Sequence, residues 1–193
     1  MCGITGYVGD RDCADVLIDA LSKLEYRGYD SAGIAVFEHG TIKVEKCKGR
    51  LSNLVEKMAR DGKPVGHCGI GHTRWATHGE PSDINSHPHG NKRVSIVHNG
   101  IIENYTELKE KLLKHGYTFY SETDTEVVIK LVDYYYRKYN LGPVDAIAKT
   151  MVRVRGSYAL ELMFRDYPGE IWVARKDSPM IIGIADGETY VAS

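Results

Sequence analysis

The N-terminal stretch of this 193-residue sequence reads Cys2-Gly-Ile-Thr-Gly-Tyr-Val-Gly9 directly after Met1. It is short, glycine-rich and partly β-branched, which predicts a strand that other backbone approaches closely. The small side chain of Cys2 permits removal of Met1, which leaves a thiol and a free α-amine on one residue. At neutral pH an α-amine of pKa about 8 can accept the proton of a thiol of pKa about 8.5. The stretch therefore predicts an N-terminal nucleophile.

The position of Cys2 does not establish this role, because a free cysteine in a first strand more often packs as a small hydrophobic residue. The remaining cysteines have apolar or strand surroundings and no terminal amine, so we interpret Cys13, Cys47 and Cys68 as packing residues. Four cysteines without a CxxC pair also disfavour a disulfide scaffold and indicate a reducing compartment.

The composition is that of an ordinary packed globule, with 42% hydrophobic residues and 6 prolines. Lys and Arg number 25 against 26 for Asp and Glu, so no net field attracts nucleic acid or an anionic membrane. The first residues do not show a basic region followed by an apolar one, and no apolar run approaches the roughly 18 residues that a spanning helix needs. We expect a cytoplasmic protein with a small-molecule partner.

Hydrophobic periodicity predicts helices and strands in separate blocks. Helices are expected over residues 14–24, 51–60, 105–115, from Asp124 to Tyr135, and over 144–153. Strands are expected over residues 2–9, 34–38, 41–46, 67–75, 94–98, 158–164, 170–174, 180–185 and 188–192, with a long polar loop over 76–93. This pattern favours an α+β fold of antiparallel sheets covered by helices, formed by a single domain over residues 1–193.

The dipeptide Asn99-Gly100, directly after the strand expected over residues 94–98, offers a side-chain amide and a backbone N–H. Acyl transfer from an amide needs such donors to stabilise the developing oxyanion. The alternative is a simple Asn-Gly turn, which is the commonest short turn signal. The sequence after Gly100 does not supply the return strand of a simple hairpin.

Arg74 and Asp124 are candidates for binding a free amino acid, which needs a cation for its carboxylate and an anion for its ammonium group. An exposed arginine is the alternative for Arg74, and a helix N-cap is the alternative for Asp124.

A short stretch holds several histidines, and a metal site is one alternative for them. It contains neither HExxH nor a paired Cys/His spacing, and we expect these side chains to form hydrogen bonds instead. They are His67, His72, His78, His87 and His89. No phosphate-binding glycine loop is present, and we expect no cofactor.

Five stretches occur in the order found in one family. They are Cys2-Gly-Ile4, Tyr26-Arg-Gly-Tyr-Asp-Ser-Ala-Gly33, Gly71-His-Thr-Arg-Trp-Ala-Thr-His-Gly79, His98-Asn-Gly100 and Ser121-Glu-Thr-Asp-Thr-Glu126. The chain resembles the class II glutamine amidotransferases, which are N-terminal nucleophile (Ntn) hydrolases. The resemblance implies a four-layer αββα sandwich that hydrolyses glutamine.

The resemblance also implies roles for individual residues. Cys2 is expected to be the nucleophile, with its own α-amine as the base, and Asn99 and Gly100 the oxyanion donors. Arg74 is expected to bind the carboxylate of L-glutamine and Asp124 its ammonium group. Further residues are expected to line the pocket (Trp75, Thr77 and His78) or to support the nucleophile loop (Arg27 and Gly28), with residues 74–79 as a mobile lid.

Within the family, Arg27-Gly-Tyr-Asp30 and Arg74-Trp-Ala-Thr77 resemble the amino-sugar-forming members more than the purine-pathway members. This implies transfer of ammonia to a sugar phosphate by a C-terminal isomerase domain, in a homodimer or larger assembly. We expect that domain to be absent from these residues and the last glutaminase elements to be missing. Two alternatives stay open: an Ntn amidase acting on another small amide, and a catalytically silent regulatory or binding module.

Overall fold

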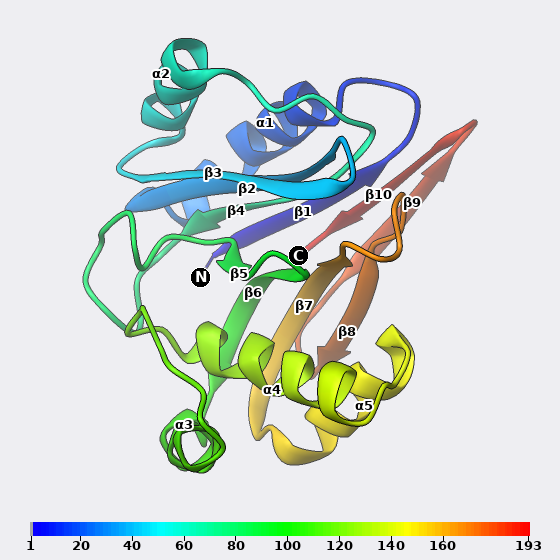
Figure 1. Cartoon of the computed structure of the whole chain (residues 1–193). Coiled ribbons are helices and arrows are strands. Elements are labelled where there is room, and N and C mark those ends of the chain that lie inside the picture. The colour runs from blue at the N-terminus through cyan, green and yellow to red at the C-terminus, as the bar shows by residue number, and fades with distance from the viewer. Residues whose placement is uncertain (1) are drawn as a thin grey trace.

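Two antiparallel β-sheets lie face to face between two layers of helices in the computed structural model of the chain (Figure 1). The structure describes residues 2–193, so the predicted removal of Met1 lies outside the described residues. The layers form the αββα sandwich of the α+β class, which confirms the predicted fold class.

The first sheet has six strands in the order β3-β2-β4-β1-β10-β9. They are β1 (Gly3–Val8), β2 (Ser31–Glu38), β3 (Thr41–Lys48), β4 (Cys68–Arg74), β9 (Ile181–Ala185) and β10 (Glu188–Ala192). Helices α1 (Cys13–Leu24) and α2 (Leu51–Asp61) pack against its outer face, and the short 3-10 helix η1 (Glu25–Arg27) follows α1. Strands β1 and β10, from opposite ends of the colour bar, lie side by side (Figure 1).

The second sheet has four strands in the order β5-β6-β7-β8. They are β5 (His89–Gly90), β6 (Val94–Ile102), β7 (Gly156–Phe164) and β8 (Trp172–Lys176). Helices α3 (Tyr105–Lys114), α4 (Asp124–Lys138) and α5 (Pro143–Arg153) cover its outer face. No helix among residues 2–193 is both long enough and apolar enough to cross a membrane.

The central strands are buried on both faces, so their side chains alternate between two cores. On β6, Ile96 packs against the helices, whereas its neighbour Val97 packs between the sheets. On β1, Ile4 also lies between the sheets. Cys2 and Asn99 are each two residues from one of these inner side chains. The alternation therefore directs both toward the space between the sheets.

The predicted helices form close to their expected bounds, for the local reasons that the sequence suggests. The Asp12 side chain caps α1 by accepting a hydrogen bond from the Ala14 N–H at 3.1 Å. Pro143 is the first residue of α5, where its missing N–H costs no helical hydrogen bond. The predicted hairpin around His39-Gly40 also forms, with its strands longer than expected.

The interpretation of Asp124 as a helix N-cap is wrong. Thr123 is the N-cap of α4, and its hydroxyl accepts a hydrogen bond from the Glu126 N–H at 3.3 Å. The Glu126 carboxylate in turn accepts from the N–H groups of Tyr120 and Ser121. Because the Thr123 side chain already caps the helix start, the buried carboxylate of Asp124 is not needed as a cap.

The expected end of β6 at His98, and with it the Asn-Gly turn, is also wrong. Strand β6 continues to Ile102 and pairs along its length with β7, so Asn99 lies opposite Ala159 and Gly100 opposite Tyr158. Gly100 has a φ of 142°, and a Cβ there would lie 2.1 Å from the Ser157 carbonyl oxygen. Cross-strand pairing has therefore overridden the local turn preference.

The expected polar loop over residues 76–93 is only partly a surface loop. It contains the two residues of β5, and several of its polar side chains are buried. The buried ones are Asn85, Ser86, His87 and His89.

Glu161 of β7 is a fully buried carboxyl group between the two sheets. Neither of its oxygens has a hydrogen-bond partner, and a Cβ on Gly6 of β1 would lie 2.9 Å from Oε2. Burial raises the pKa of Glu161 well above its ordinary value, so the folded protein holds this group as a neutral acid.

We expect Glu161→Met to raise the free energy of unfolding at pH 7 by about 1–3 kcal/mol, because an unpaired buried polar group is replaced by an apolar one of similar size. Between the unfolded pKa of about 4.3 and the raised folded pKa, only the folded state keeps the proton. The stability of the parent should therefore fall as pH rises through this window. Urea titrations from pH 4 to 8 measure both effects. Glu161→Gln, which cannot ionise, should lose this pH dependence, and an unchanged slope would contradict the prediction.

Candidate active site

Cys2 directly precedes β1, and its thiol is held by the backbone of Trp75. The Trp75 N–H donates to Sγ at 3.4 Å, and the thiol donates to the Trp75 carbonyl oxygen at 3.5 Å. Burial raises the pKa of the Cys2 thiol; the Trp75 hydrogen bond and the Arg74 charge act against this rise, and Asp30 adds to it. A protonated thiol at neutral pH needs a base to become a nucleophile.

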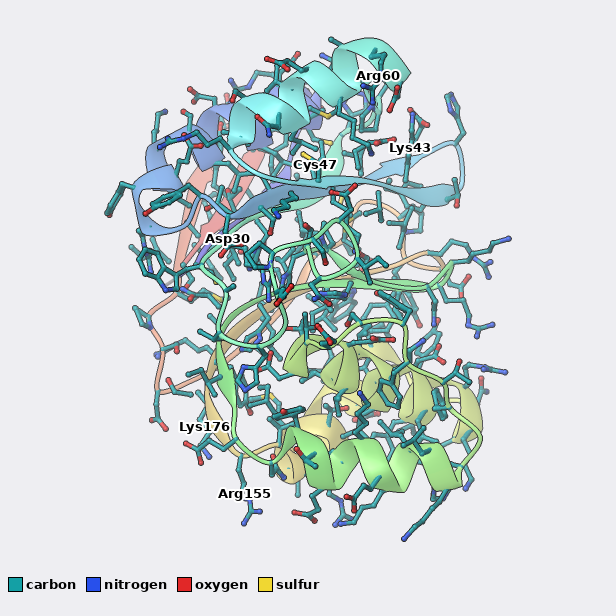
Figure 2. The ribbon with its side chains drawn as sticks, turned by 90° about the vertical axis from the view of Figure 1, so that its left-hand side faces the viewer. Asp30, Lys43, Cys47, Arg60, Arg155 and Lys176 are labelled. Carbon is teal, nitrogen blue, oxygen red and sulfur yellow. The ribbon has the colours of Figure 1, made fainter. Side chains whose placement is uncertain are left out.

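The turn at residues 28–30 shapes the backbone that holds Cys2. A Cβ on Gly28 would lie 2.5 Å from the Arg74 carbonyl carbon and 2.7 Å from the Trp75 nitrogen, so only glycine allows this approach. Asp30 accepts a hydrogen bond from the Ala76 N–H, and its own N–H donates to the Arg74 carbonyl oxygen at 3.1 Å. Asp30 lies on the side of the six-stranded sheet that faces the other sheet, whereas Cys47 lies beneath α2 (Figure 2).

Arg74 ends β4 and is 2% exposed, so the interpretation as a surface arginine is wrong. Its guanidinium group donates to the carbonyl oxygens of His78, of Gly79 at 2.9 Å and of Glu80 at 3.4 Å. Burial lowers its pKa, and Asp30, Cys2 and Asp124 oppose that shift. Arg74 thus supports the backbone of residues 78–80 while placing a positive charge near Cys2.

Asp124 lies close to the side chain of His78, the first residue of this segment. Asp124 is 4% exposed, and its Oδ2 accepts a hydrogen bond from the Ile102 N–H at 2.8 Å. The same oxygen lies 4.0 Å from His78 Nδ1. His78 therefore lies between the Arg74 guanidinium, which binds its carbonyl oxygen, and the Asp124 carboxylate. A cation and an anion flank one residue.

Asn99 of β6 is 7% exposed, and its Nδ2 donates to Ser193 Oγ at 3.2 Å. Ser193 continues β10 and exchanges both backbone hydrogen bonds with Ile4 of β1, at 3.0 and 3.1 Å. Cys2 lies two residues before Ile4, about 7 Å along the strand. The structure thus links the Asn99 carboxamide to the strand that carries Cys2.

The other predicted site residues lie around this centre with fewer contacts. Thr77 Oγ1 lies 3.2 Å from His78 Nδ1. The Trp75 ring is 50% exposed and meets Tyr29 edge-on at 6.0 Å between ring centroids. Arg27, in η1, is half-buried, and none of the hydrogen bonds or ion pairs found for residues 2–193 involves its side chain. Among the described residues, the structure therefore gives no hydrogen bond or ion pair that would join the Arg27 side chain to the Cys2 thiol.

Four buried histidines form a cluster against this site, joined by short contacts. His72 donates from Nε2 to the His98 carbonyl oxygen at 2.9 Å, and the His72 and His87 rings stack at 3.9 Å. His87 and His98 both contact Thr125 Oγ1 at 2.9 Å, while His89 lies edge-on to His87.

Burial lowers the pKa of all four histidines, that of His72 to about 3, so the cluster is neutral at pH 7. Because Thr125 follows Asp124, the cluster links β4 and β6 to the start of α4. His67, in contrast, is exposed. Among residues 2–193 no group of three or more His, Cys, Asp or Glu side chains is arranged to hold a metal ion.

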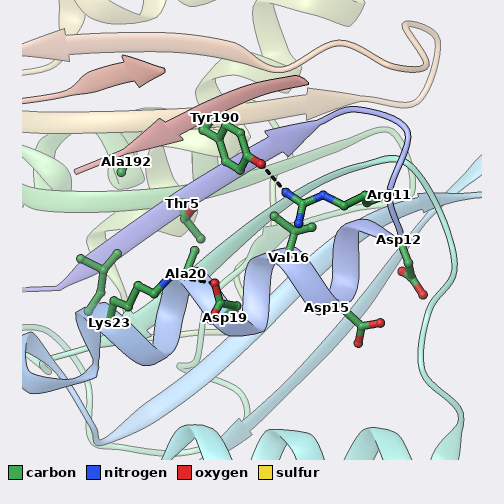
Figure 3. Close-up of a pocket in the computed structure, with 11 residues that line it drawn as sticks. Thr5, Arg11, Asp12, Asp15, Val16, Asp19, Ala20, Lys23, Tyr190 and Ala192 are labelled. Atoms are coloured by element: carbon green, nitrogen blue, oxygen red, sulfur yellow. Dashed lines mark hydrogen bonds and ion pairs between the residues drawn. The ribbon is translucent and has the colours of Figure 1, made fainter. Parts of the chain in front are cut away.

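A hollow of about 510 Å³ opens beside this centre, lined by residues 76–80 together with Tyr105 and Glu122. A larger groove of about 660 Å³ lies between α1 and β10 (Figure 3). None of Cys2, Arg74, Asn99 or Asp124 lines that groove, and its charged side chains are paired, as in Lys23 with Asp19. These four residues do not line the smaller hollow either, but its lining includes His78, whose Nδ1 lies 4.0 Å from Asp124 Oδ2 and whose carbonyl oxygen accepts a hydrogen bond from Arg74. The smaller hollow therefore adjoins the candidate site.

Three supporting residues were missed by the sequence reasoning. Asp30 belongs to the family-like stretch of residues 26–33, and that membership is the sequence signal that could identify it. His98 belongs in the same way to the family-like stretch of residues 98–100. Ser193 carries no sequence signal, because its contact with Asn99 depends on the pairing of β10 with β1.

A family model described as a glutamine amidotransferase domain matches residues 72–193. Relatives from Clostridium tetani, Clostridium perfringens and Pyrococcus horikoshii, each named glutamine–fructose-6-phosphate aminotransferase (isomerizing), are 53%, 54% and 51% identical to this chain over 195 residues. The alignments cover 100% of this chain but only 31%, 31% and 32% of the relatives. The chain thus spans less than a third of their length.

Two solved structures share the fold. Glutamine phosphoribosylpyrophosphate amidotransferase from B. subtilis, complexed with ADP and GMP, has a TM-score of 0.83 and 27% identity, covering 99% of this chain and 41% of its own. A structure of the allosteric regulatory enzyme of purine biosynthesis has a TM-score of 0.86 and 28% identity, covering 100% of this chain and 42% of its own. Both similarities extend over essentially all of this chain, including both sheets.

Proposed function

Because this chain belongs to the glutamine amidotransferase domain family and has the αββα fold of the class II, Ntn members, we propose that it hydrolyses the side-chain amide of L-glutamine to glutamate and ammonia. The observation that carries the proposal is the Cys2 thiol, held by the Trp75 backbone on a strand that Ser193 links to Asn99.

In the proposed reaction, Cys2 Sγ attacks the amide carbon of glutamine while the thiol proton passes to the Cys2 α-amine. The new C–S bond leaves an oxyanion, which accepts hydrogen bonds from Asn99 Nδ2 and the Gly100 N–H. Collapse of this intermediate breaks the C–N bond, and ammonia leaves with the proton from the α-ammonium group. Water then attacks the thioester, which releases glutamate and restores the thiol. No cofactor is needed for these steps.

The raised pKa of the Cys2 thiol supports the need for an adjacent base. Removal of Met1 would supply that base as the α-amine of Cys2. We propose that a chain retaining Met1 has the same fold and little or no activity.

Arg74 and Asp124 are the proposed ligands of the amino-acid part of the substrate. The guanidinium group can pair with the α-carboxylate, and the carboxylate with the α-ammonium group. Their placement on either side of His78 supports this assignment. Thr77, His78 and Trp75 are proposed to line the same pocket, and Gly28 to support the Cys2 site through its contact with Arg74 and Trp75.

We expect Asp124→Asn to raise the KM for glutamine by about 10- to 100-fold, because a charge-assisted hydrogen bond is worth about 1.5–3 kcal/mol. Asparagine keeps an oxygen to accept the Ile102 hydrogen bond, so the fold should be retained. The matched comparison uses 5-amino-5-oxopentanoate, which lacks the α-ammonium group. The parent should prefer glutamine strongly, and the variant should not; equal preference in both proteins would contradict the role of Asp124.

Glutamate release by purified protein tests the function directly, after intact mass has shown that Met1 is absent. Faster release of ammonia from glutamine than from other small amides supports the proposal, whereas the reverse would favour a different Ntn amidase. No amidase activity together with a stoichiometric metal would favour the silent binding module.

We further propose that, in a protein of the relatives' length, the ammonia converts fructose 6-phosphate to glucosamine 6-phosphate. The relatives' names support this, and so does their length beyond the aligned region. The partner would be the sugar-phosphate isomerase domain of the same polypeptide, in an enzyme of the glucosamine-6-phosphate synthase type that forms a homodimer or larger assembly.

A further inference from the structure

The side-chain amide of Asn99 makes one hydrogen bond among the described residues, from Nδ2 to Ser193 Oγ at 3.2 Å. Ser193 is 8% exposed, and its hydroxyl donates to the Pro179 carbonyl oxygen at 2.6 Å. Because that proton is used, the oxygen lone pairs of Ser193 are directed to accept from Asn99. The two hydrogen bonds therefore run in one direction, from the Asn99 amide to the Ser193 hydroxyl and from that hydroxyl to the Pro179 carbonyl oxygen.

The position of Ser193 is fixed independently of its side chain. Its N–H and carbonyl oxygen exchange hydrogen bonds with Ile4, two residues from Cys2 on the same strand. The hydroxyl is therefore in register with the nucleophile strand of the first sheet, whereas Asn99 belongs to the second sheet.

We propose that Ser193 is a positioning residue for the oxyanion donor: it accepts one Nδ2 proton of Asn99 and thereby directs the other toward the oxygen of the substrate amide. This inference rests on the proposed function of Asn99. A primary amide nitrogen has two protons in one plane, so fixing one of them fixes the direction of the other. A donor already oriented loses no reorganisation energy when the oxyanion forms.

We expect Ser193→Ala to lower kcat for glutamine about three- to tenfold with little change in KM. The lost neutral hydrogen bond orients Asn99, and Asn99 donates to the substrate oxygen mainly when the oxyanion forms. Asn99→Ala removes the group through which Ser193 acts. In that background Ser193→Ala should therefore lower kcat less than twofold. Ser95→Ala is the matched control: Ser95 is a buried serine of β6 whose hydroxyl has no hydrogen-bond partner, and kcat should not change.

A loss of equal size in the Asn99→Ala background, a change in KM alone, or unchanged kcat in Ser193→Ala would each overturn the positioning role. If the parent hydrolyses glutamine and Ser193→Ala has the same kcat, the positioning role of Ser193 fails while the proposed function stands.

The Asn99 Nδ2 proton resonances give a readout that needs no activity. In ¹⁵N spectra they are assigned by their absence in Asn99→Ala. One of the pair should shift upfield in Ser193→Ala and stay in place in Ser95→Ala. An unmoved pair would overturn the inference even if the parent proved inactive toward glutamine, a result that would count separately against the proposed function.

Discussion

Replacing Cys2 with alanine is expected to lower kcat for glutamine hydrolysis by about 10⁴- to 10⁶-fold, the scale seen when a catalytic nucleophile is removed. The thiol forms the bond that the proposed reaction requires, and no other cysteine among residues 2–193 can replace it, because Cys13, Cys47 and Cys68 are buried in the cores. Cys2 is half-buried at the end of a strand, so the variant should fold normally.

The measurement is glutamate release by Met1-processed protein, with thermal unfolding as a check of the fold. Cys47→Ala is the matched control: it removes a thiol on the far side of the six-stranded sheet, and activity should be retained. An alkylating glutamine analogue should modify Cys2 alone in peptide maps. If Cys2→Ala kept more than a tenth of the parental rate, the nucleophile would have to be sought elsewhere.

Asn99→Ala is expected to lower kcat by about 10²- to 10³-fold with KM nearly unchanged, as for loss of one oxyanion-hole donor. The side chain lies between the sheets at the level of the nucleophile strand, and its Nδ2 is the proposed donor. Because the negative charge develops only after attack, substrate binding should not depend on this group.

Asn104→Ala provides the contrast for Asn99. Asn104 is also a buried asparagine, but its side chain joins the Arg153 carbonyl oxygen and the Arg155 N–H, away from Cys2. Its loss should lower the free energy of unfolding while kcat stays within about twofold. Steady-state kinetics and urea titrations on both variants separate the two roles. Equal kinetic losses in the two variants would contradict the assignment of Asn99.

Much of the fold could be predicted because periodicity and local capping agree with the tertiary structure. The helix beginning near Asp12 and the hairpin at His39-Gly40 are stabilised by contacts between residues close in sequence. The end of β6 could not be predicted in this way. Asn99 and Gly100 are held in a strand by residues of β7, far along the chain, and no local pattern reports that pairing.

The composition of the candidate site was predicted from motifs, whereas its internal contacts were not. Motif order identified Cys2, Arg74 and Asp124, but not that Thr123 would cap α4 and free Asp124. Glu161 shows the same limit, since a glutamate within the strand expected over residues 158–164 gives no local sign that it will be buried. In the structure both faces of β7 are buried, because each sheet surface is covered by another layer.

The pairing of β1 with β10 has a consequence for synthesis of the chain on the ribosome. Among the described strands β1 is translated first, but β10, its partner on one side, is translated last. Contacts between segments so distant in sequence form late in folding, since loop closure must precede them. We expect the nascent chain to hold β1 paired with β4 on one edge while its other edge stays open, with hydrolysis beginning only when β10 has docked.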